Sequence, residues 1–329
     1  MITLAHRTLG RSGLAVSVVG LGCNNFGRPG TLTQTQEGTT AVIDAADDLG
    51  VTLLDTADMY GGNPGQSEIY LGHALVGRRD RFVVATKFGH SEVDLGIANG
   101  APKGSREYIR TAVRDSLRRL GTDHIDLYQL HTPDPSTPVA DTIGALNELV
   151  AEGTIVHFGH SNFTAQQVVA ADEAAQQLGG SRFESAQNEF SLLARDAERD
   201  LLPTVRRFGL GFLPYFPLYN GLLTGKFTRT VRPGDTRIAR QRPHVADDAP
   251  WDTLERYEAF CAEHGVTMLA ATISWLLAQP GLTSVIAGAT NPEQLRQNAA
   301  ASRDWAPTAG ELHTISDIFA GPALPGPSV

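Results

Sequence analysis

Residues 51–60 read VTLLDTADMY, and this stretch organises the interpretation of the whole chain. It begins as an apolar run typical of a buried strand and ends in polar groups that a strand does not need for packing. Asp55, Asp58 and Tyr60 come immediately before the turn signal Gly61-Gly62, and Ser67 is predicted to cap the following helix. Polar chemistry is therefore expected at the carboxyl end of this strand.

Short apolar runs alternate with segments of helical period along the rest of the chain. Eight strands are predicted, at 18–22, 51–55, 82–87, 125–130, 154–159, 183–187, 210–215 and 283–287. Because no change in composition divides the chain, this alternation favours a closed parallel (β/α)₈ TIM barrel, a single domain over 1–329, rather than two domains. Residues 7–19 are predicted to form a β-hairpin that covers the barrel as a lid or plug. The tail at 320–329 is predicted to be disordered.

Capping signals place several helices. A helix over 105–120 is predicted to begin at Ser105 and end before Gly121, and two others are predicted to begin at Thr137-Pro138 and Asn291-Pro292. The four arginines of the first helix are interpreted as a solvated face rather than an anion site; they are Arg110, Arg114, Arg118 and Arg119. Residues 224–250 are predicted to be a long irregular loop that borders the functional site and precedes a helix near Trp251.

Composition excludes several classes of protein. The chain has 329 residues and a formal net charge of −9, which argues against binding to nucleic acid. Its two cysteines, Cys23 and Cys261, have no metal-ligand spacing and suggest no disulfide framework, as in a reducing cytoplasm. Neither a leader segment nor an apolar run of about 18 residues is recognisable. We therefore expect a soluble, cytoplasmic protein without a membrane or nucleic-acid partner.

The ends of three consecutive predicted strands carry complementary reactive groups. Asp55 and Tyr60 follow the second strand, Lys87 ends the third, and His131 follows the fourth. Singly, each has an ordinary explanation as a turn former, a solvated side chain or a packing residue. Together they favour a catalytic set, because barrel active sites lie at the carboxyl ends of the strands. Asp58 is interpreted as part of the turn.

The residue types suggest carbonyl reduction. A phenol with a reference pKa near ~10 is a poor proton donor at neutral pH unless its phenolate is stabilised, and a neighbouring ammonium such as Lys87 does this. Asp55 would keep Lys87 charged, and His131 would donate a hydrogen bond to a carbonyl oxygen. None of these side chains supplies a hydride, so a nicotinamide cofactor is implied.

Several separated motifs resemble those of the aldo-keto reductases, in the same order and over nearly the whole chain. They are LLDTADMY, ATKFG, IDLYQLH, GHSNF, QNEFSLL, YFPLYNGLLTGK and IAGATNPEQLRQN. The resemblance implies a (β/α)₈ barrel, an extended NADP(H), and a catalytic set at Asp55, Tyr60, Lys87 and His131. The substrate would be a small aldehyde, ketone or alcohol, with sugars and polyols included, and the protein a monomer or homo-oligomer.

The resemblance also implies cofactor contacts. Ser161, Asn162 and Gln187 would hold the carboxamide, and Tyr215 would stack on the nicotinamide ring. A segment that runs to Lys226 would wrap the pyrophosphate; the implied contacts in it are Phe216, Pro217, Leu218, Asn220, Gly221 and Lys226. From the residues alone, NGLLTGK reads as a turn followed by a helical piece. The implied set also includes Cys23, Asn24 and Asp55.

The adenosine end departs from the family pattern. Relatives commonly place an Arg, Lys or Ser against the 2′-phosphate, whereas this chain has a run without an obvious cation; its implied contacts are Gly288, Thr290, Gln294, Gln297 and Asn298. Arg296 is a further candidate. Backbone N–H groups at Asn291 still favour an anion. NADP(H) is therefore expected, with NAD(H) as the alternative.

Substrate contacts are the least determined. Side chains after the first three strands and near the long loop are candidates; these are Cys23, Asn24, Asn25, Phe26, Met59, Phe88 and Trp251. Phe26 and Phe88 are equally interpretable as packing residues.

Two alternatives to a reductase stay open. Proteins that resemble potassium-channel β subunits share the fold and the GLLTGK-like loop, so a cofactor-binding regulatory or redox-sensing subunit is one. A barrel metal hydrolase that uses Asp55, Asp58 and His131 is the other, although no cluster of histidines supports it.

Overall fold

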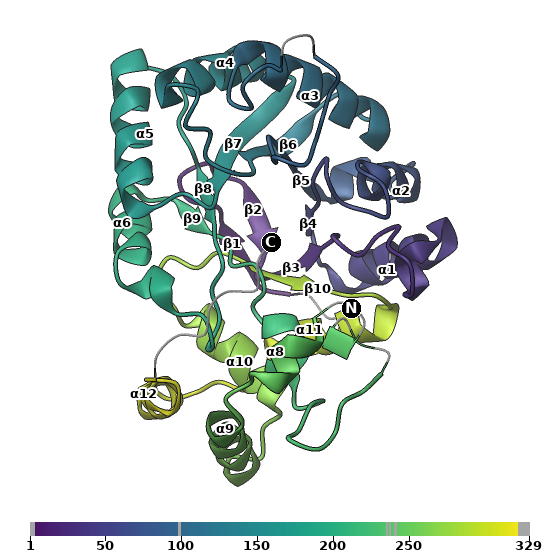
Figure 1. Ribbon diagram of the computed structural model, residues 1–329, viewed down its shortest axis with the longest axis vertical. Coiled ribbons are helices and arrows are strands. Elements are labelled where there is room, and N and C mark those ends of the chain that lie inside the picture. The colour runs from purple at the N-terminus through teal and green to yellow at the C-terminus, as the bar shows by residue number, and fades with distance from the viewer. Residues whose placement is uncertain (1–3, 98–99, 235, 237, 240–241, 322–329) are drawn as a thin grey trace.

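The computed structural model describes residues 4–97, 100–234, 236, 238–239 and 242–321, and it confirms the barrel with its hairpin. Figure 1 shows a ring of strands inside a layer of helices. The parallel strands lie in the order β10-β3-β4-β5-β6-β7-β8-β9. Their bounds are β3 Val19–Gly22, β4 Leu53–Asp55, β5 Val83–Phe88, β6 Ile125–Leu130, β7 Ile155–Ser161, β8 Ser185–Gln187, β9 Gly211–Phe212 and β10 Val285–Gly288.

The last and first strands of this order meet and close the ring. Phe212 forms a parallel bridge with Leu282, and the Thr283 N–H donates to the Phe212 carbonyl at 2.9 Å. The Ile286 N–H donates to the Pro214 carbonyl at 3.2 Å. The predicted strand 210–215 is shorter than expected, since Pro214 has no N–H to donate to a neighbouring strand.

Helices follow most of the strands and cover the outside of the barrel. The α-helices are α1 Gln36–Leu49, α2 Gln66–Ala74, α3 Arg106–Leu120, α4 Val139–Ala151, α5 Ala165–Leu178, α6 Leu201–Phe208, α8 Pro243–Asp247, α9 Trp251–Glu263, α10 Met268–Leu277, α11 Pro292–Ala301 and α12 Ala309–Ile318. The 3₁₀-helices are η1 Leu32–Gln34, η2 Arg79–Arg81, η3 Asp196–Glu198 and η4 Tyr219–Thr224.

The capping predictions have mixed outcomes. Ser105 accepts from the Tyr108 N–H, Gly121 ends α3 with φ 63°, and Asn291 caps α11, as expected. The prediction for α4 is wrong by one position, because Pro138 takes the N-cap place while the Thr137 hydroxyl donates to Asp134. Helices therefore begin near the predicted residues even where the capping partner differs.

Ser67 does not cap α2. Gly65 occupies that position, and the Ser67 hydroxyl is buried, where it donates to the Cys23 carbonyl at 2.9 Å. This residue instead ties α2 to the loop that follows β3.

The N-terminal hairpin plugs the amino-terminal end of the barrel. Its strands are β1 His6–Thr8 and β2 Ala15–Ser17, and Leu9 is fully buried among inward-facing side chains such as Leu53 and Leu127. Gly10 makes this close approach possible, because a Cβ there would lie 2.4 Å from the Glu184 carbonyl oxygen. Solvent and ligands therefore reach the barrel interior from the other end.

The barrel interior changes from apolar to polar along each strand. Inward positions alternate with outward ones, so Leu53 and Asp55 share the inner face of β4, and Ala85 and Lys87 share that of β5. On β6 the inward positions pass from Leu127 to Gln129. Charged and amide groups therefore collect inside the carboxyl-terminal end.

The prediction that residues 224–250 form an irregular loop is wrong in part, since this segment contains the short helix α8. The predicted tail from residue 322 onward lies outside the described residues, and the single-domain assignment stays a prediction. Among the described residues, no single helix has the length and apolarity to span a membrane; α9 and α10 reach them only as a pair, bent by 93°.

Candidate active site

A buried ion pair forms the base of the candidate site. Lys87 Nζ lies 2.7 Å from Asp55 Oδ2, and the two side chains are 0% and 4% exposed. The ammonium also donates to the Thr56 carbonyl at 2.9 Å. Asp55 Oδ1 accepts from Gln187 Nε2 at 2.9 Å and from Gln129 Nε2 at 3.4 Å. Both charges are thus compensated inside the barrel, which is the condition for burying them.

Tyr60 stands above this pair and is half-buried. Its hydroxyl lies 3.5 Å from Lys87 Nζ, and the ammonium lies 4.9 Å from the centre of the phenol ring. Burial alone would lower the pKa of Lys87, but Asp55 and then Tyr60 outweigh it and raise that pKa. The ammonium is therefore charged and placed to stabilise a phenolate.

His131 completes the set predicted from the strand ends. Its ring centre lies 5.8 Å from that of Tyr60, in an edge-on arrangement. Burial, then Lys87 and His90, hold the pKa of His131 well below its usual range. The imidazole is therefore neutral, and its Nδ1 is buried without a hydrogen-bond partner among the described residues.

Neighbouring strands position these side chains. Asp55 is in register with Ala85, and Lys87 with Gln129, so β4, β5 and β6 deliver their groups to one level. The loop with Tyr60 is fixed by a bond from the Ser67 N–H to the Tyr60 carbonyl at 3.0 Å. The four predicted catalytic residues thus lie together, although the geometry alone does not assign their roles.

Asp58 lies on the other side of the same loop. It occupies the turn from Ala57 to Tyr60, but its carboxylate is buried and makes no hydrogen bond to the described residues. Burial and then Glu68 raise the pKa of Asp58 to about 8, although Arg119 opposes this. The side chain is therefore a neutral acid near α2 and α3.

The metal-hydrolase alternative finds no support in this arrangement. In the described part of the chain, no group of three or more histidine, cysteine or acidic side chains is placed to share a metal ion. Asp55 is engaged with Lys87, and Asp58 is oriented toward a different cluster.

Side chains predicted to hold a nicotinamide carboxamide lie beside the catalytic set. The Ser161 hydroxyl donates to the Gln187 carbonyl at 2.7 Å, and Asn162 Nδ2 donates to the His131 carbonyl at 3.0 Å. The Tyr215 hydroxyl donates to Asn162 Oδ1 at 2.9 Å. This network joins β7, β8 and the end of β9 into one wall.

The segment after Tyr215 is held in an unusual backbone conformation. All four non-glycine residues with positive φ in the described chain lie in this segment or at the GHSN motif; they are Asn162, Phe216, Tyr219 and Asn220. Such residues cost about 1–3 kcal/mol each and cluster at ligand sites. The Asn220 amide is buried and has no partner among the described residues, while Lys226 is exposed.

The predicted adenosine end is partly exposed and already hydrogen-bonded within itself. Gln294 Oε1 accepts from both the N–H and the hydroxyl of Thr290, at 2.8 and 3.0 Å. Arg296 lies 3.6 Å from Glu293. Gln297 donates to the same Glu293, and buried Asn298 donates to the Gly288 carbonyl at 3.4 Å. These contacts leave few free donors for a 2′-phosphate.

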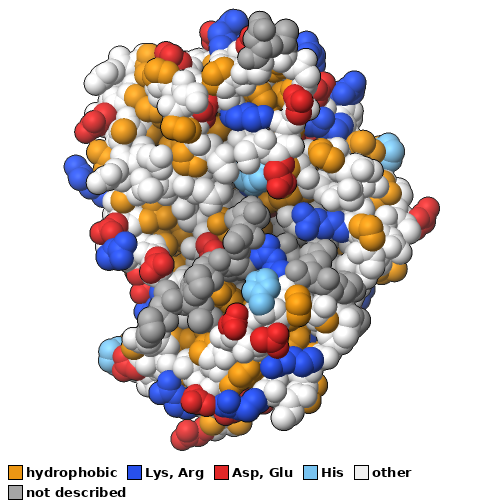
Figure 2. Space-filling model, in the orientation of Figure 1, with side chains coloured by type: hydrophobic (Ala, Val, Ile, Leu, Met, Phe, Trp, Pro, Cys, Tyr) orange, Lys and Arg blue, Asp and Glu red, His pale blue; other side chains and the backbone are white. Residues whose placement is uncertain are grey.

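A nicotinamide cofactor fits the remaining polar groups. Buried polar atoms normally have partners, yet the Asn24 side-chain oxygen, His131 Nδ1 and the Asn220 amide have none among the described residues. All three follow strands or belong to the segment after β9. Figure 2 shows basic, acidic and histidine side chains near the middle of the face that carries α8.

Comparison with known proteins agrees with this fit. The family model described as "Aldo/keto reductase family" matches residues 18–315. The chain belongs to the aldo/keto reductase family. Aldo/keto reductases use nicotinamide cofactors, so the chain is an NAD(P)H-dependent oxidoreductase.

Three relatives show how widely functions vary within the family. An uncharacterized oxidoreductase of Bacillus subtilis, YrpG, is 35% identical over 97% of both chains. The NADH-specific methylglyoxal reductase of Escherichia coli is 37% identical over 77% of this chain and 78% of its own. A probable voltage-gated potassium channel subunit beta of Oryza sativa is 32% identical over 90% of both chains.

Sequence reasoning missed two neighbours of the catalytic set. Gln129 bonds to Asp55, and the ring centre of His90 lies 5.0 Å from that of His131. Strand alternation gave a signal for Gln129, which is two positions before His131. Nothing marked His90, because it lies in the loop after β5.

Several predicted substrate contacts of this aldo/keto reductase are packing residues. Phe26 and Phe88 are 0% exposed, and Phe88 stacks on Tyr128 with ring centres 4.6 Å apart. Trp251 is also buried, and its indole N–H donates to the Ala246 carbonyl. Met59 and Asn25 are half-buried and stay candidates.

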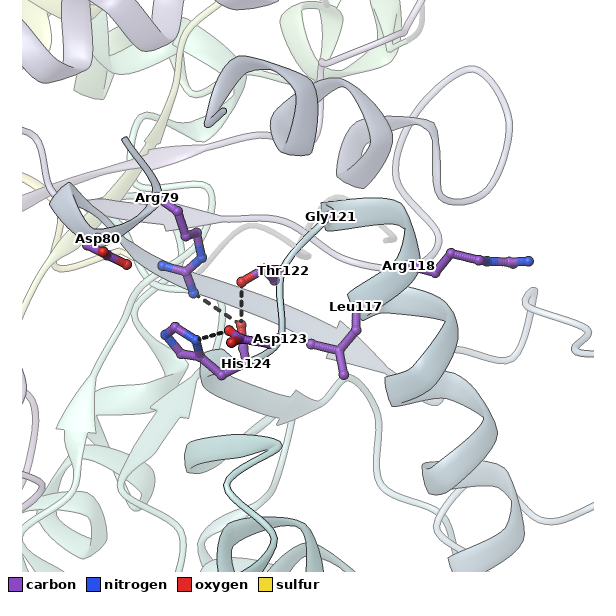
Figure 3. A pocket seen from close by; sticks show the side chains of 8 residues that line it. All are labelled: Arg79, Asp80, Leu117, Arg118, Gly121, Thr122, Asp123 and His124. Atoms are coloured by element: carbon purple, nitrogen blue, oxygen red, sulfur yellow. Dashed lines mark hydrogen bonds and ion pairs between the residues drawn. The ribbon is translucent and has the colours of Figure 1, made fainter. Parts of the chain in front are cut away.

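The pocket in Figure 3 lies elsewhere and is unrelated to this chemistry. It lies between η2 and the turn from α3 into β6, at the amino-terminal side of the barrel. Several of its polar groups are engaged locally, since His124 bonds to Asp123 at 2.8 Å and Arg79 bonds to the His124 carbonyl, although Arg79 Nε has no partner among the described residues. The orphaned polar atoms at the opposite end are the better guide to the site.

Proposed function

We propose that this aldo/keto reductase interconverts a small aldehyde or ketone and its alcohol, with NADP(H) as cofactor and Tyr60 as general acid and base. The observation that carries the proposal is the hydrogen-bonded chain Asp55–Lys87–Tyr60, with contacts of 2.7 and 3.5 Å. A positioned acid of this kind contributes roughly 10²–10⁴-fold to a rate.

Each side chain has a distinct role in the proposal. Tyr60 donates its proton to the carbonyl oxygen, and Lys87 stabilises the phenolate that remains. Asp55 keeps Lys87 charged and oriented. Neutral His131 hydrogen-bonds the carbonyl oxygen as negative charge develops on it. The bound nicotinamide supplies the hydride.

Residues around the catalytic set would hold the cofactor. Ser161, Asn162 and Gln187 are proposed to bind the carboxamide, Tyr215 to stack on the ring, and the segment from Phe216 to Lys226 to hold the pyrophosphate. Positive φ at Phe216 and Asn220 supports this, because it turns the backbone as a close ligand contact requires. Cys23 and Asn24 are proposed as neighbours of the nicotinamide end.

The choice between the two nicotinamide cofactors depends on the adenosine end. NADP(H) is the proposal from the family resemblance, and NAD(H) is the alternative. The internal bonds of Thr290 and the Arg296–Glu293 contact support the alternative, as does the relative named for NADH specificity. Both cofactors therefore belong in the first experiment.

Relatives indicate the size of the substrate. Two Escherichia coli relatives are named for small carbonyl compounds: the methylglyoxal reductase above, and an L-glyceraldehyde 3-phosphate reductase that is 30% identical over 96% of this chain and 93% of its own. We propose a substrate of this class for the present chain. A cytoplasmic location and a monomeric or homo-oligomeric state stay predictions from the sequence.

A regulatory subunit with weak catalysis is the second candidate. The observation that favours it is the 32% identity to a probable potassium channel subunit beta over 90% of both chains. Such a protein would bind the cofactor and oxidise it slowly with every carbonyl offered.

Cofactor titration followed by a carbonyl panel tests the proposal. Quenching of protein fluorescence by NADPH and NADH measures each affinity, and loss of nicotinamide absorbance measures turnover with aldehydes, ketones and sugars. Multiple turnovers with at least one small carbonyl are expected. Tight cofactor binding with only stoichiometric oxidation across the panel would favour the regulatory alternative.

A further inference from the structure

The loop after β3 brings Arg28 to the rim of the active site. The Cys23 N–H donates to the Asp55 carbonyl at 2.8 Å, which fixes the start of this loop beside β4. A Cβ on Gly62 would lie 2.8 Å from the Gly27 carbonyl oxygen, so the loop also packs closely against the one that carries Tyr60. The Arg28 N–H donates to the Asn25 carbonyl at 3.1 Å and holds the residue in a turn.

Arg28 has no acceptor for its side chain among the described residues. It is half-buried, and its Nε is buried without a hydrogen-bond partner. Other half-buried arginines have acceptors. Arg79 Nε is also without a partner, but the terminal nitrogens of Arg79 bond to Asp126, and Arg119 bonds to Glu68, each at 2.6 Å. A desolvated guanidinium without an acceptor is unfavourable, so Arg28 is prepared for an anion that the chain itself does not provide.

The charged groups around Arg28 indicate that an anion bound there would lie near Tyr60, the proposed proton donor. Burial lowers the pKa of Arg28, Tyr60 raises it, and Arg242 lowers it again. Arg28 is therefore within electrostatic range of the proposed proton donor and of a second cation. The Arg242 guanidinium lies 5.4 Å from the centre of the Phe216 ring, in the segment after β9.

The acids in this neighbourhood do not neutralise Arg28. Glu92 interacts with Arg28, but it is exposed, and no ion pair joins the two among the described residues. Glu189 interacts with Arg242 rather than with Arg28, and burial raises the pKa of Glu189 to about 7. Arg28 therefore contributes uncompensated positive charge at the mouth of the site near neutral pH.

We propose that Arg28 forms an anion subsite for the substrate, so that the preferred substrates are aldehydes or ketones that carry a carboxylate or phosphate group. The inference rests on the proposed reductase function. A guanidinium binds either oxyanion through paired N–H donors, and its place within electrostatic range of Tyr60 would direct the carbonyl toward the proton donor. Arg28 acts as a specificity determinant and not as a proton donor.

Two matched aldehydes test the subsite. Para-carboxybenzaldehyde and its methyl ester carry the same carbonyl and differ in charge. In Arg28→Gln we expect kcat/KM for the acid to fall by about 10- to 100-fold, the size of a lost charge-assisted hydrogen bond, while the ester changes by less than about twofold. Arg28→Lys should recover part of the loss, and added salt should weaken turnover of the acid alone.

A control variant and a cofactor titration separate the possible failures. Arg118→Gln makes the same change in net charge at a side chain that is 75% exposed and lies by the pocket of Figure 3, so it should leave both substrates unchanged. Equal losses for acid and ester in Arg28→Gln, no loss for either, or weaker cofactor binding would overturn the subsite. A wild-type protein that reduces no carbonyl at all would refute the proposed function, and this inference with it.

Discussion

Two buried aspartates at the end of β4 lie in contrasting surroundings. Asp55 faces the inside of the barrel and is bonded to Lys87, Gln187 and Gln129. Asp58, three residues later, faces the layer between the barrel and helices α2 and α3, and no described residue bonds to its carboxylate. The two residues are 3% and 2% exposed, so depth of burial does not distinguish them.

The difference shows that hydrogen-bond and ion-pair partners, rather than the depth of burial, distinguish the two buried carboxyl groups. Asp55 has an ammonium at 2.7 Å as its counter-ion, and it holds that ammonium in place below Tyr60. Asp58 has no hydrogen-bond donor among the described residues, and its raised pKa indicates that it stays protonated and neutral. Only the inner side of this loop therefore carries the charged groups of the proposed catalytic set.

Lys87→Met should have the largest effect, because it removes the partner that makes the inner side different. Tyr60 loses the cation that stabilises its phenolate, so kcat should fall by roughly 10²–10⁴-fold. Asp55 is left as a buried charge without its counter-ion, which should lower the free energy of unfolding by about 3–5 kcal/mol. Steady-state kinetics and urea unfolding measure the two effects. Nearly normal turnover in a folded variant would contradict the role of Lys87.

A matched pair, Asp55→Asn and Asp58→Asn, compares the two sides directly. Asp55→Asn removes the acceptor charge beside Lys87 and should lower turnover at least about tenfold and stability by about 3–5 kcal/mol. Asp58→Asn replaces a neutral acid by an amide of the same shape, so turnover should change by less than about twofold. Equal effects of the two substitutions on kcat would contradict the different roles assigned to Asp55 and Asp58.

A smaller effect is expected in the pH dependence of the free energy of unfolding, to which Asp58 should contribute. The pKa of Asp58 is about 8 in the folded protein and near 3.8 in the unfolded chain, so the folded state binds the proton more tightly. The contribution of Asp58 is complete below about pH 4 and is lost as the pH rises to about 8. The effect is several kcal/mol at most, since one pH unit in this window corresponds to about 1.4 kcal/mol.

Urea unfolding at several pH values measures this contribution. The wild type should lose more stability than Asp58→Asn between pH 5 and 8, values that fall inside the window set by the two pKa values of Asp58. Parallel stability curves for the two proteins would show that Asp58 is ionised in the folded state at neutral pH.

The sequence predicts the residues that face the inside of the barrel well, because the alternation of side chains along a strand and the order of consecutive strands determine their positions. Leu53 and Asp55 must share one face of β4, and β5 and β6 must deliver Lys87 and His131 to the same end. The chemical types of these residues then suggest a carbonyl reductase from the amino-acid sequence alone.

The outer side is less predictable, because side-chain partners there come from other helices. Arg119 falls off the apolar face of α3, a position that predicts a solvated side chain, yet it pairs with buried Glu68 of α2. Ser67 has the sequence position of a cap but bonds to the loop after β3. Likewise, positive φ at Phe216 has no sequence signal, since bulky residues rarely adopt it.

Tyr60→Phe tests the central claim most directly, because it deletes only the hydroxyl that lies 3.5 Å from Lys87 Nζ. Rapid mixing of enzyme, reduced cofactor and aldehyde follows the loss of nicotinamide absorbance in a single turnover, and fluorescence titration checks cofactor affinity. We predict unchanged cofactor affinity and a transfer rate lower by roughly 10²–10⁴-fold. A transfer rate within about threefold of the wild type would contradict the assignment of Tyr60 as the proton donor.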